Sequence, residues 1–544
     1  MKERTKLGLR VLEAALLMGL LGDALLRATP WGVNLLLWVA ALMAAVIALL
    51  ARWRRGVLNA EARWLLLPVV FFAAGFAWRD SETLRSLDVV ALLVALSLVA
   101  LRSRTGRIHL AGVVEYAVGT VVAAVDALFG PFLLLLDDIK WREMPRSGWS
   151  RHMAAVVRGL AIALPLLLIF GGLFMAADAV FEGIVNRAFN LNFETLFSHT
   201  VLAILFAWLA GGFLRGVLLG KGMEFGRAGL PEILSTPPTE TDSQTGQAET
   251  ESSEKPLPTK PVSLGIVEIG VVLGLLNLLF LAFVTIQIRY FFGGAAFAQA
   301  ATGLTYADYA RRGFFELVAV ATLVLPLLLV AHWLLRKENL THERIFRVLA
   351  GAQVALLFVI MASAVGRMRL YQSEYGLTEL RLYTTAFMGW LAVVFIWFAL
   401  SVLRGERERF ACGALVTGFL VLATLHAINP DALIVRVNAA RAQAGRAFDA
   451  DYASSLSADA VPALFETLPT LGRYNRCVVA TDLLDRRASS DGGDWRTWNR
   501  SRSRARGLLQ ENLGALLDLN CPLDGRETTG QPGEASRGPV QQRY

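Results

Sequence analysis

Long apolar runs recur along almost the whole chain, and short polar connections separate them. A helix needs about 20 mostly apolar residues to cross the hydrocarbon core of a bilayer. The pattern therefore predicts an all-α protein, a polytopic transmembrane helical bundle of about eleven spans with twelve as the alternative. A small soluble helical domain is expected after the last span. The predicted spans are 8–27, 32–51, 64–79, 86–101, 152–176, 196–218, 264–288, 313–335, 346–366, 383–403 and 410–428.

The segment 109–138 decides between the two counts. It is apolar, but it carries Glu115 and Asp126 and is interrupted at Gly130 and Pro131. If it does not cross, all lysines and the main arginine groups fall on one side, as the positive-inside rule requires for the cytoplasmic side. We therefore expect a re-entrant or interfacial segment, a cytoplasmic N-terminus and a C-terminus outside. Twelve spans would instead place the C-terminus inside.

Polar stretches divide the chain into parts. Residues 231–262 are rich in Pro, Ser, Thr and Glu, and such a composition buries too little apolar surface to fold. The expected parts are a four-span bundle at 1–108, the re-entrant or interfacial segment with a basic cytoplasmic loop at 109–150, a two-span hairpin at 151–230, a disordered cytoplasmic linker at 231–262, a five-span block at 263–430, an extracytoplasmic helical domain at 431–522 and a disordered tail at 523–544.

Composition supports the membrane assignment. Hydrophobic residues make up 55% of the chain and charged residues 18%, and the mean hydropathy is +0.50. In soluble domains apolar residues average about 45–50% and charged residues about 25%. The net charge of +8 comes from basic residues at the ends of apolar runs, which is typical of topology signals. We therefore expect the lipid bilayer as a partner and no nucleic acid.

Familiar catalytic and cofactor motifs are incomplete. The glycines around Lys221 lack the spacing and the Ser/Thr of a phosphate loop, and the pattern that begins at His342 has Phe346 where a second zinc-binding histidine belongs. Asp80 and Glu82 form an acidic pair in a predicted outer loop, for which a solvated loop is the favoured interpretation. We expect no cofactor, no metal and no catalytic residues, and the question of enzyme activity stays open with a non-enzyme favoured.

Polar residues gather where three spans of the five-span block are expected to reach the outer surface. They have two interpretations: an interfacial lock built from Arg–Glu pairs and tyrosines, or a site for an anionic ligand such as phosphate or carboxylate. An isolated carboxylate near a span is costly, so Glu316 or Glu374 is predicted to pair with Arg311 or Arg312 and with Arg367 or Arg369. The candidate binding residues are Gln287, Arg289, Tyr306, Tyr309, Arg311, Arg312, Glu316, Arg367, Arg369, Tyr371, Glu374 and Arg381.

One run in this cluster resembles the hallmark of a known family. Leu304-Thr-Tyr-Ala-Asp-Tyr-Ala-Arg-Arg-Gly-Phe-Phe-Glu-Leu317 is similar to a motif of bacterial polytopic membrane proteins catalogued as domain of unknown function 4173. The further matching pieces are Gly274-Leu-Leu-Asn-Leu278, Tyr290-Phe-Phe-Gly-Gly294, Tyr375-Gly-Leu-Thr378, Arg381-Leu-Tyr383 and Asn429-Pro-Asp-Ala432. The resemblance covers roughly 160–470 and implies a bacterial inner-membrane protein. It implies no activity, substrate or catalytic residues.

Two cysteines lie in the polar C-terminal region. If that region is outside, Cys477 and Cys521 are in an oxidising compartment, where a disulfide between them becomes an open possibility. The alternative is two unrelated small residues. The basic segment 495–506 between them could rest on anionic headgroups through its arginines and tryptophans, although a solvated helix face is the favoured interpretation.

Three functions remain open from the sequence. The favoured one is a non-enzymatic transport-, channel- or receptor-like protein with an outward-facing Arg/Tyr/Glu cluster for an anionic ligand. A scaffold that holds a protein partner through residues 431–522 is the second, and a membrane enzyme acting on a lipid-linked or envelope substrate is the third. The oligomeric state is not predicted.

Overall fold

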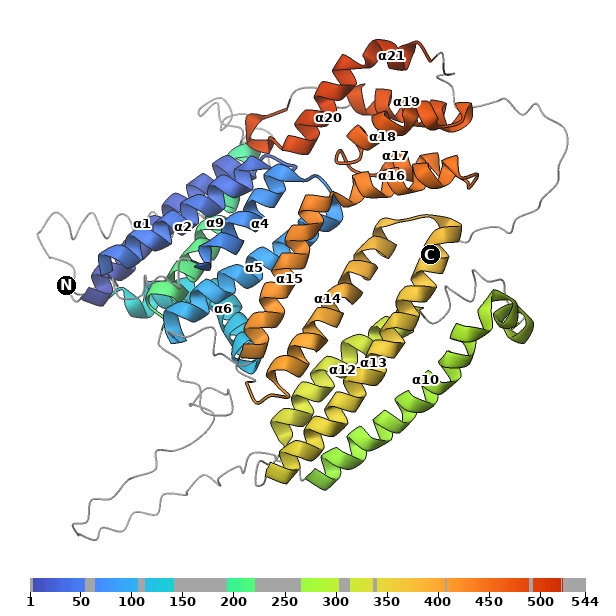
Figure 1. The fold of residues 1–544 in the computed structure, drawn as a ribbon. Helices are drawn as coiled ribbons and strands as arrows, with labels where there is room; N and C mark the ends of the chain where they lie inside the picture. Colours follow the sequence, from blue (N-terminus) through green and yellow to red (C-terminus); the bar gives the residue numbers. More distant parts are fainter. Residues whose placement is uncertain are drawn as a thin grey trace, which may run out of the picture.

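The computed structural model describes residues 3–53, 64–105, 113–140, 193–220, 266–302, 314–335, 340–406, 409–488, 493–519 and 521. Within these residues the chain is helical and contains no strand (Figure 1). Nine of the described helices are long and apolar enough to cross a membrane. The fold is therefore an all-α polytopic helical bundle, and the chain is a multi-pass membrane protein, as the apolar runs predict.

The first block of helices packs around one apolar core. Helices α1 and α9 approach closely because small residues face each other: a Cβ on Gly19 would lie 2.5 Å from the Cβ of Ala207, and one on Gly22 would lie 2.6 Å from the Phe206 ring. The helices of this block are α1 (Glu3–Leu26), α2 (Val33–Trp53), α4 (Leu66–Trp78), α5 (Glu82–Thr105), α6 (Val113–Leu133) and α9 (Phe193–Leu218).

A second apolar core joins the next four helices, and the last span connects the two blocks. Leu422 and Leu425 of this last span belong to the core of the first block, whereas Phe410 at its other end belongs to the second. The helices here are α10 (Ile266–Thr302), α12 (Phe314–Leu334), α13 (Leu340–Tyr375), α14 (Glu379–Ser401) and α15 (Phe410–Ile428).

A small helical domain with its own core follows α15. Asn429 adopts a left-handed conformation (φ 59°), and its side-chain oxygen accepts a hydrogen bond from the Ala432 amide at the start of the next helix. The turn places the domain beyond one end of the spans, which we call the domain end; the opposite end is the far end (Figure 1). Its helices are α16 (Pro430–Gln443), α17 (Ala450–Ser455), α18 (Val461–Thr467), α19 (Arg473–Ala488), α20 (Arg500–Glu511) and α21 (Leu513–Leu517).

Helix α6 occupies the segment for which a re-entrant or interfacial path is predicted. It continues into a π-helical turn, Leu134–Asp138, and residues 116–138 are long and apolar enough to span a bilayer. Near its beginning Gly119 lies against Leu101 of α5, and at its end Asp138 binds Arg4 of α1 and Arg215 of α9. Leu101 lies in the last turns of α5 and Arg4 in the first turn of α1. The non-crossing path stays a prediction.

Several predicted segments lie outside the described residues. They are the span at 152–176, the linker at 231–262 and the tail at 523–544. The orientation of the termini also stays a prediction.

Candidate functional site

The structure describes only part of the predicted Arg/Tyr/Glu cluster. Tyr306, Tyr309, Arg311 and Arg312 lie outside the described residues, as do the side chains of Gln287 and Arg289 in α10. Glu316 is exposed in the first turn of α12. The remaining members, Arg367, Arg369, Tyr371, Glu374 and Arg381, lie on the last turns of α13 and the first turn of α14.

Two of these residues contact each other at the domain end. The Arg381 guanidinium lies 4.1 Å from the centre of the Tyr371 ring, and it donates to the Gly376 carbonyl at 2.5 Å. Both side chains line a mostly apolar cavity of about 280 Å³, together with Phe314 and Phe315. The cluster therefore brings one arginine and one tyrosine together, on the α13–α14 turn.

Glu374 has a different partner from the one predicted. Its carboxylate accepts two hydrogen bonds from Arg446 of the helical domain, at 2.8 and 3.3 Å. Arg441 of α16 donates to the carbonyls of Ser373 and Glu374. Within the described residues Arg446 takes the place that Arg367 or Arg369 was predicted to have, because the end of α13 brings Glu374 within reach of the domain. Arg311 and Arg312 lie outside the described residues, so the predicted pairing stays a prediction. The contact joins α13 to the helical domain.

The same turn holds the domain through backbone groups. Gly376 has a positive φ of 78°, and a Cβ there would lie 2.7 Å from the Asn438 amide oxygen. The Asn438 side chain accepts from the Leu377 amide (2.7 Å) and donates to the Leu377 carbonyl (2.8 Å). The Tyr452 hydroxyl accepts from the Glu379 amide. The α13–α14 turn and the domain are thus joined by buried hydrogen bonds.

Asp459 is the centre of a second polar junction, which the sequence analysis did not identify. Its side chain is 1% exposed and accepts hydrogen bonds from the Asp80 amide (2.5 Å), the Ser81 amide (3.0 Å), Arg79 (3.3 Å) and the Ser501 hydroxyl. These donors come from the α4–α5 loop and from α20. One carboxylate therefore joins the first helical block to two segments of the domain.

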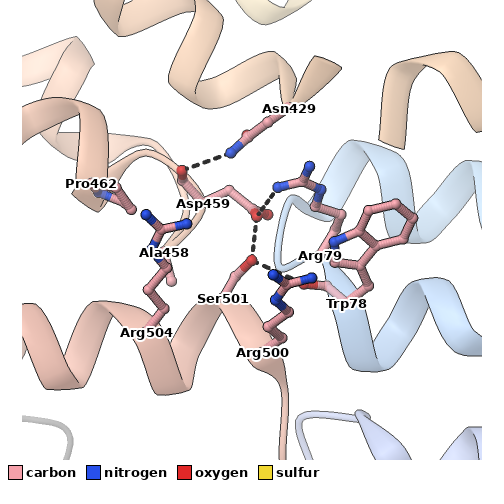
Figure 2. A pocket seen from close by; sticks show the side chains of 9 residues that line it. All are labelled: Trp78, Arg79, Asn429, Ala458, Asp459, Pro462, Arg500, Ser501 and Arg504. Carbon is pink, nitrogen blue, oxygen red and sulfur yellow. Dashed lines mark hydrogen bonds and ion pairs between the residues drawn. The ribbon is translucent and has the colours of Figure 1, made fainter. Parts of the chain in front are cut away.

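A cavity of about 210 Å³ lies beside Asp459 (Figure 2). Three guanidinium groups line it, those of Arg79, Arg500 and Arg504, and Trp78 and Pro462 form apolar walls. Arg79 is held by the His426 carbonyl and by Asp459, whereas Arg500 and Arg504 are exposed on α20. The cavity thus has three positive charges against one carboxylate.

Asp431, at the start of α16, is a buried carboxylate in the same region. It is 1% exposed, and one of its oxygens accepts from the Ser457 hydroxyl (2.5 Å) and the Ser457 amide (3.2 Å). The other oxygen, Oδ1, has no hydrogen-bond partner among the described residues. Burial raises the pKa of Asp431 to about 6, and the nearby carboxylates of Glu379 and Asp459 act in the same direction.

A buried histidine–aspartate pair lies below this junction. His426 of α15 and Asp88 of α5 are joined at 2.8 Å, and their side chains are 0% and 1% exposed. The Trp78 ring stacks on the imidazole. Since α5 and α15 belong to different parts of the bundle, this pair fixes the last span against the first block.

Cys477 and Cys521 form a disulfide, with their Cα atoms 5.3 Å apart. It links α19 to the end of the domain. Cys412, in α15, is free.

Comparison with known families places the chain among proteins of unknown function. The model of the domain of unknown function DUF4153 matches residues 66–467. The chain belongs to the DUF4153 family. Membership of an uncharacterised family agrees with the resemblance drawn from the sequence, but the family number differs from the expected 4173. No curated protein and no solved structure matches the chain.

The DUF4153 region begins at α4 and finishes at the end of α18. It contains Arg79, Asp431 and Asp459, and α20 lies beyond it. The region also contains four of the pieces that carry the family resemblance. Residues 375–378 and 381–383 lie at the α13–α14 turn and 429–432 at the start of α16, and these two places hold the domain; 274–278 lies within α10. Asn429 also donates to the Asp459 carbonyl at 3.1 Å. The Asn-Pro-Asp-Ala piece was therefore the available signal for the Asp459 junction.

Proposed function

We propose that the chain is a non-enzymatic, receptor-like protein of the bacterial inner membrane. In this proposal the domain end faces outwards, and a small phosphate- or carboxylate-bearing ligand binds in the cavity of Figure 2. The observation that carries the proposal is the convergence of Arg79, Arg500 and Arg504 on one small cavity. Guanidinium groups suit such ligands because they donate paired, charge-assisted hydrogen bonds.

The one carboxylate in the cavity pairs with Arg79 and leaves the charges of Arg500 and Arg504 unbalanced among the residues that line it. The oxygens of Asp459 already accept from two backbone amides, a hydroxyl and Arg79. These donors occupy its lone pairs, so the carboxylate is poorly suited to act as a general base. Binding is therefore favoured over catalysis at this position.

The outward orientation has separate support. The Cys477–Cys521 disulfide is typical of a domain in an oxidising compartment. Labelling of engineered cysteines in intact cells tests it: a cysteine at 296–302 should be modified by a membrane-impermeant reagent, and one at 240–255 should be protected. Modification at 240–255 would overturn the orientation.

Anion binding can be measured on the purified full chain in detergent, with inorganic phosphate as the probe and chloride at the same ionic strength as the reference. Phosphate should raise the Tm, because a ligand that binds only the folded state stabilises it. In Arg500→Gln/Arg504→Gln the apparent affinity for phosphate should fall at least about tenfold, since charged hydrogen bonds contribute about 1.5–3 kcal/mol each.

The matched control is Arg502→Gln/Arg506→Gln, which removes two arginines from the opposite face of the same helix. It should keep the phosphate-dependent shift. An equal shift in the wild type and in both variants would mean that phosphate acts elsewhere, and the proposed site would be wrong.

A further inference from the structure

A larger groove lies on the other side of α20. It has a volume of about 950 Å³ and is bounded by the α1–α2 loop, by residues 455–458 and by α19 and α20. Arg502 and Arg506 of α20 line it, together with Arg27, Arg486 and Arg496. Positions four apart lie on the same helix face, so Arg502 and Arg506 point together into this groove and away from the cavity of Figure 2.

Positive charge exceeds negative charge in the groove. Arg27, Arg486 and Arg496 each have a carboxylate partner, in Asp23, Asp482 and Asp494 respectively. These three arginines are therefore neutralised, and the remaining positive charge in the groove comes from Arg502 and Arg506 of α20.

Arg502 and Arg506 are not balanced in this way. Asp80 is shared: it lies 2.6 Å from Arg85 and 3.6 Å from Arg502. Within the described residues Arg506 forms no ion pair, and burial together with Arg85 and Arg506 lowers the pKa of Arg502. The Arg502 Nη2 group donates to the Thr497 carbonyl at 2.6 Å, so the donors that remain for an anion are the Arg506 guanidinium and the other nitrogens of Arg502.

Exposed tryptophans adjoin residues that line the groove along the chain, and they indicate its depth relative to a bilayer. Trp31 follows the end of α1, and Trp495 and Trp498 flank the turn that carries Arg496; they are 37%, 65% and 45% exposed. The Trp498 carbonyl accepts from the Val33 amide at the beginning of α2. Exposed tryptophans at the ends of membrane spans lie at the level of the lipid headgroups.

We infer that the groove holds the phosphate of an anionic phospholipid from the leaflet on the domain side, between Arg502 and Arg506. The arginines supply the charge, the neighbouring tryptophans place them at headgroup depth, and Pro30 and Leu509 give the groove apolar walls for the glycerol region. The inference concerns a different site from the proposed receptor cavity and does not depend on it.

Lipid retention tests the inference. The full chain is placed in nanodiscs of phosphatidylcholine and phosphatidylglycerol, extracted, and analysed by native mass spectrometry for bound lipid. Wild type should retain phosphatidylglycerol in preference to phosphatidylcholine. In Arg502→Gln/Arg506→Gln this preference should fall about thirtyfold, because each arginine near an anionic surface contributes about 1 kcal/mol.

Arg500→Gln/Arg504→Gln is the matched control, and it should keep the preference. If the double variant on the groove side fails to fold, the salt dependence of the wild type serves instead: the preference should weaken as salt is raised. Equal retention of both lipids by the wild type would overturn the inference. So would displacement of the lipid by millimolar inorganic phosphate, which would identify the ligand as a soluble anion. Equal lipid retention leaves the phosphate test of the receptor cavity unchanged. Displacement by phosphate would appear in that test as a shift that Arg502→Gln/Arg506→Gln reduces, whereas failure of the receptor site would leave the shift equal in both double variants.

Discussion

The buried carboxylate of Asp431 should make the stability of the helical domain depend on pH. Its pKa is raised from 3.8 to about 6 by burial, so the fold disfavours the ionised form. A difference of about 2 pKa units corresponds to about 3 kcal/mol, at about 1.4 kcal/mol per unit. The side chain is almost fully buried, and solvent screening therefore reduces this figure little.

The sign follows from linkage. A carboxyl group with a raised pKa in the folded state binds its proton more tightly there than in the unfolded chain. Its contribution is fully present below about pH 4, and it is lost as the pH rises through about 6. The free energy of unfolding of the domain should therefore fall by about 3 kcal/mol between these values.

Asp431→Asn removes the titration and keeps an oxygen that can accept from Ser457. Pulse proteolysis in urea, on the purified full chain at a series of pH values from 4 to 7, gives the free energy of unfolding. The wild type should lose stability over this range more steeply than Asp431→Asn. Asp451→Asn, an identical change at an exposed position of α17, should behave as the wild type. If Asp431→Asn keeps the wild-type slope, the reasoning from burial is wrong.

Two other sets of substitutions should lower the stability of the protein by amounts that follow from the structure. Replacing both Cys477 and Cys521 by serine should lower the free energy of unfolding of the domain by about 4 kcal/mol, the value of the chain-entropy model for a sequence separation of 44. Pulse proteolysis should show this as a lower urea midpoint, and an unchanged midpoint would contradict the expectation. Gly212→Ala should destabilise the α6–α9 contact by about 1–3 kcal/mol, because its Cβ would lie 2.4 Å from the Ala127 carbonyl oxygen. Gly274→Ala, where nothing lies within 4 Å, is the control, and equal Tm losses in both variants would refute the packing argument.

Eight of the expected spans correspond to helices long and apolar enough to cross a membrane, because each of these carries its own apolar signal. The expected span at 8–27 lies in α1, which is not among the nine, and the one at 64–79 contains the shorter helix α4. The expected span at 410–428 coincides with α15, Phe410–Ile428. The helix that contains the expected span at 346–366 is longer than the span, since α13 begins at Leu340 and continues to Tyr375 through polar residues. Apolar runs locate the hydrocarbon region, and they say nothing about how far a helix extends into water.

The Asp459 junction could not be predicted in the same way. Asp459 is 380 residues from Arg79 and 42 from Ser501 along the chain, and no local periodicity relates them. The sequence indicates Asp80 only as a member of an acidic pair in a loop, whereas its contact with Arg502 is made by the fold. When a polar site is built from loops of separate blocks, the sequence shows its members only as isolated polar residues and does not show that they meet.

The junction explains why α20 can present two different surfaces. Asn499 caps its first turn and donates to the carbonyls of Phe76 and Arg79, and Ser501 binds Asp459 and the Trp78 carbonyl. These bonds fix the beginning of the helix against the α4–α5 loop, and its rotation is set with them. Arginines at every second position then divide between two faces, since residues four apart share a face and residues two apart do not. A shift of α20 by one residue would remove both arginine pairs from their hollows, so the buried hydrogen bonds of Asp459 and Asn499 position both proposed sites.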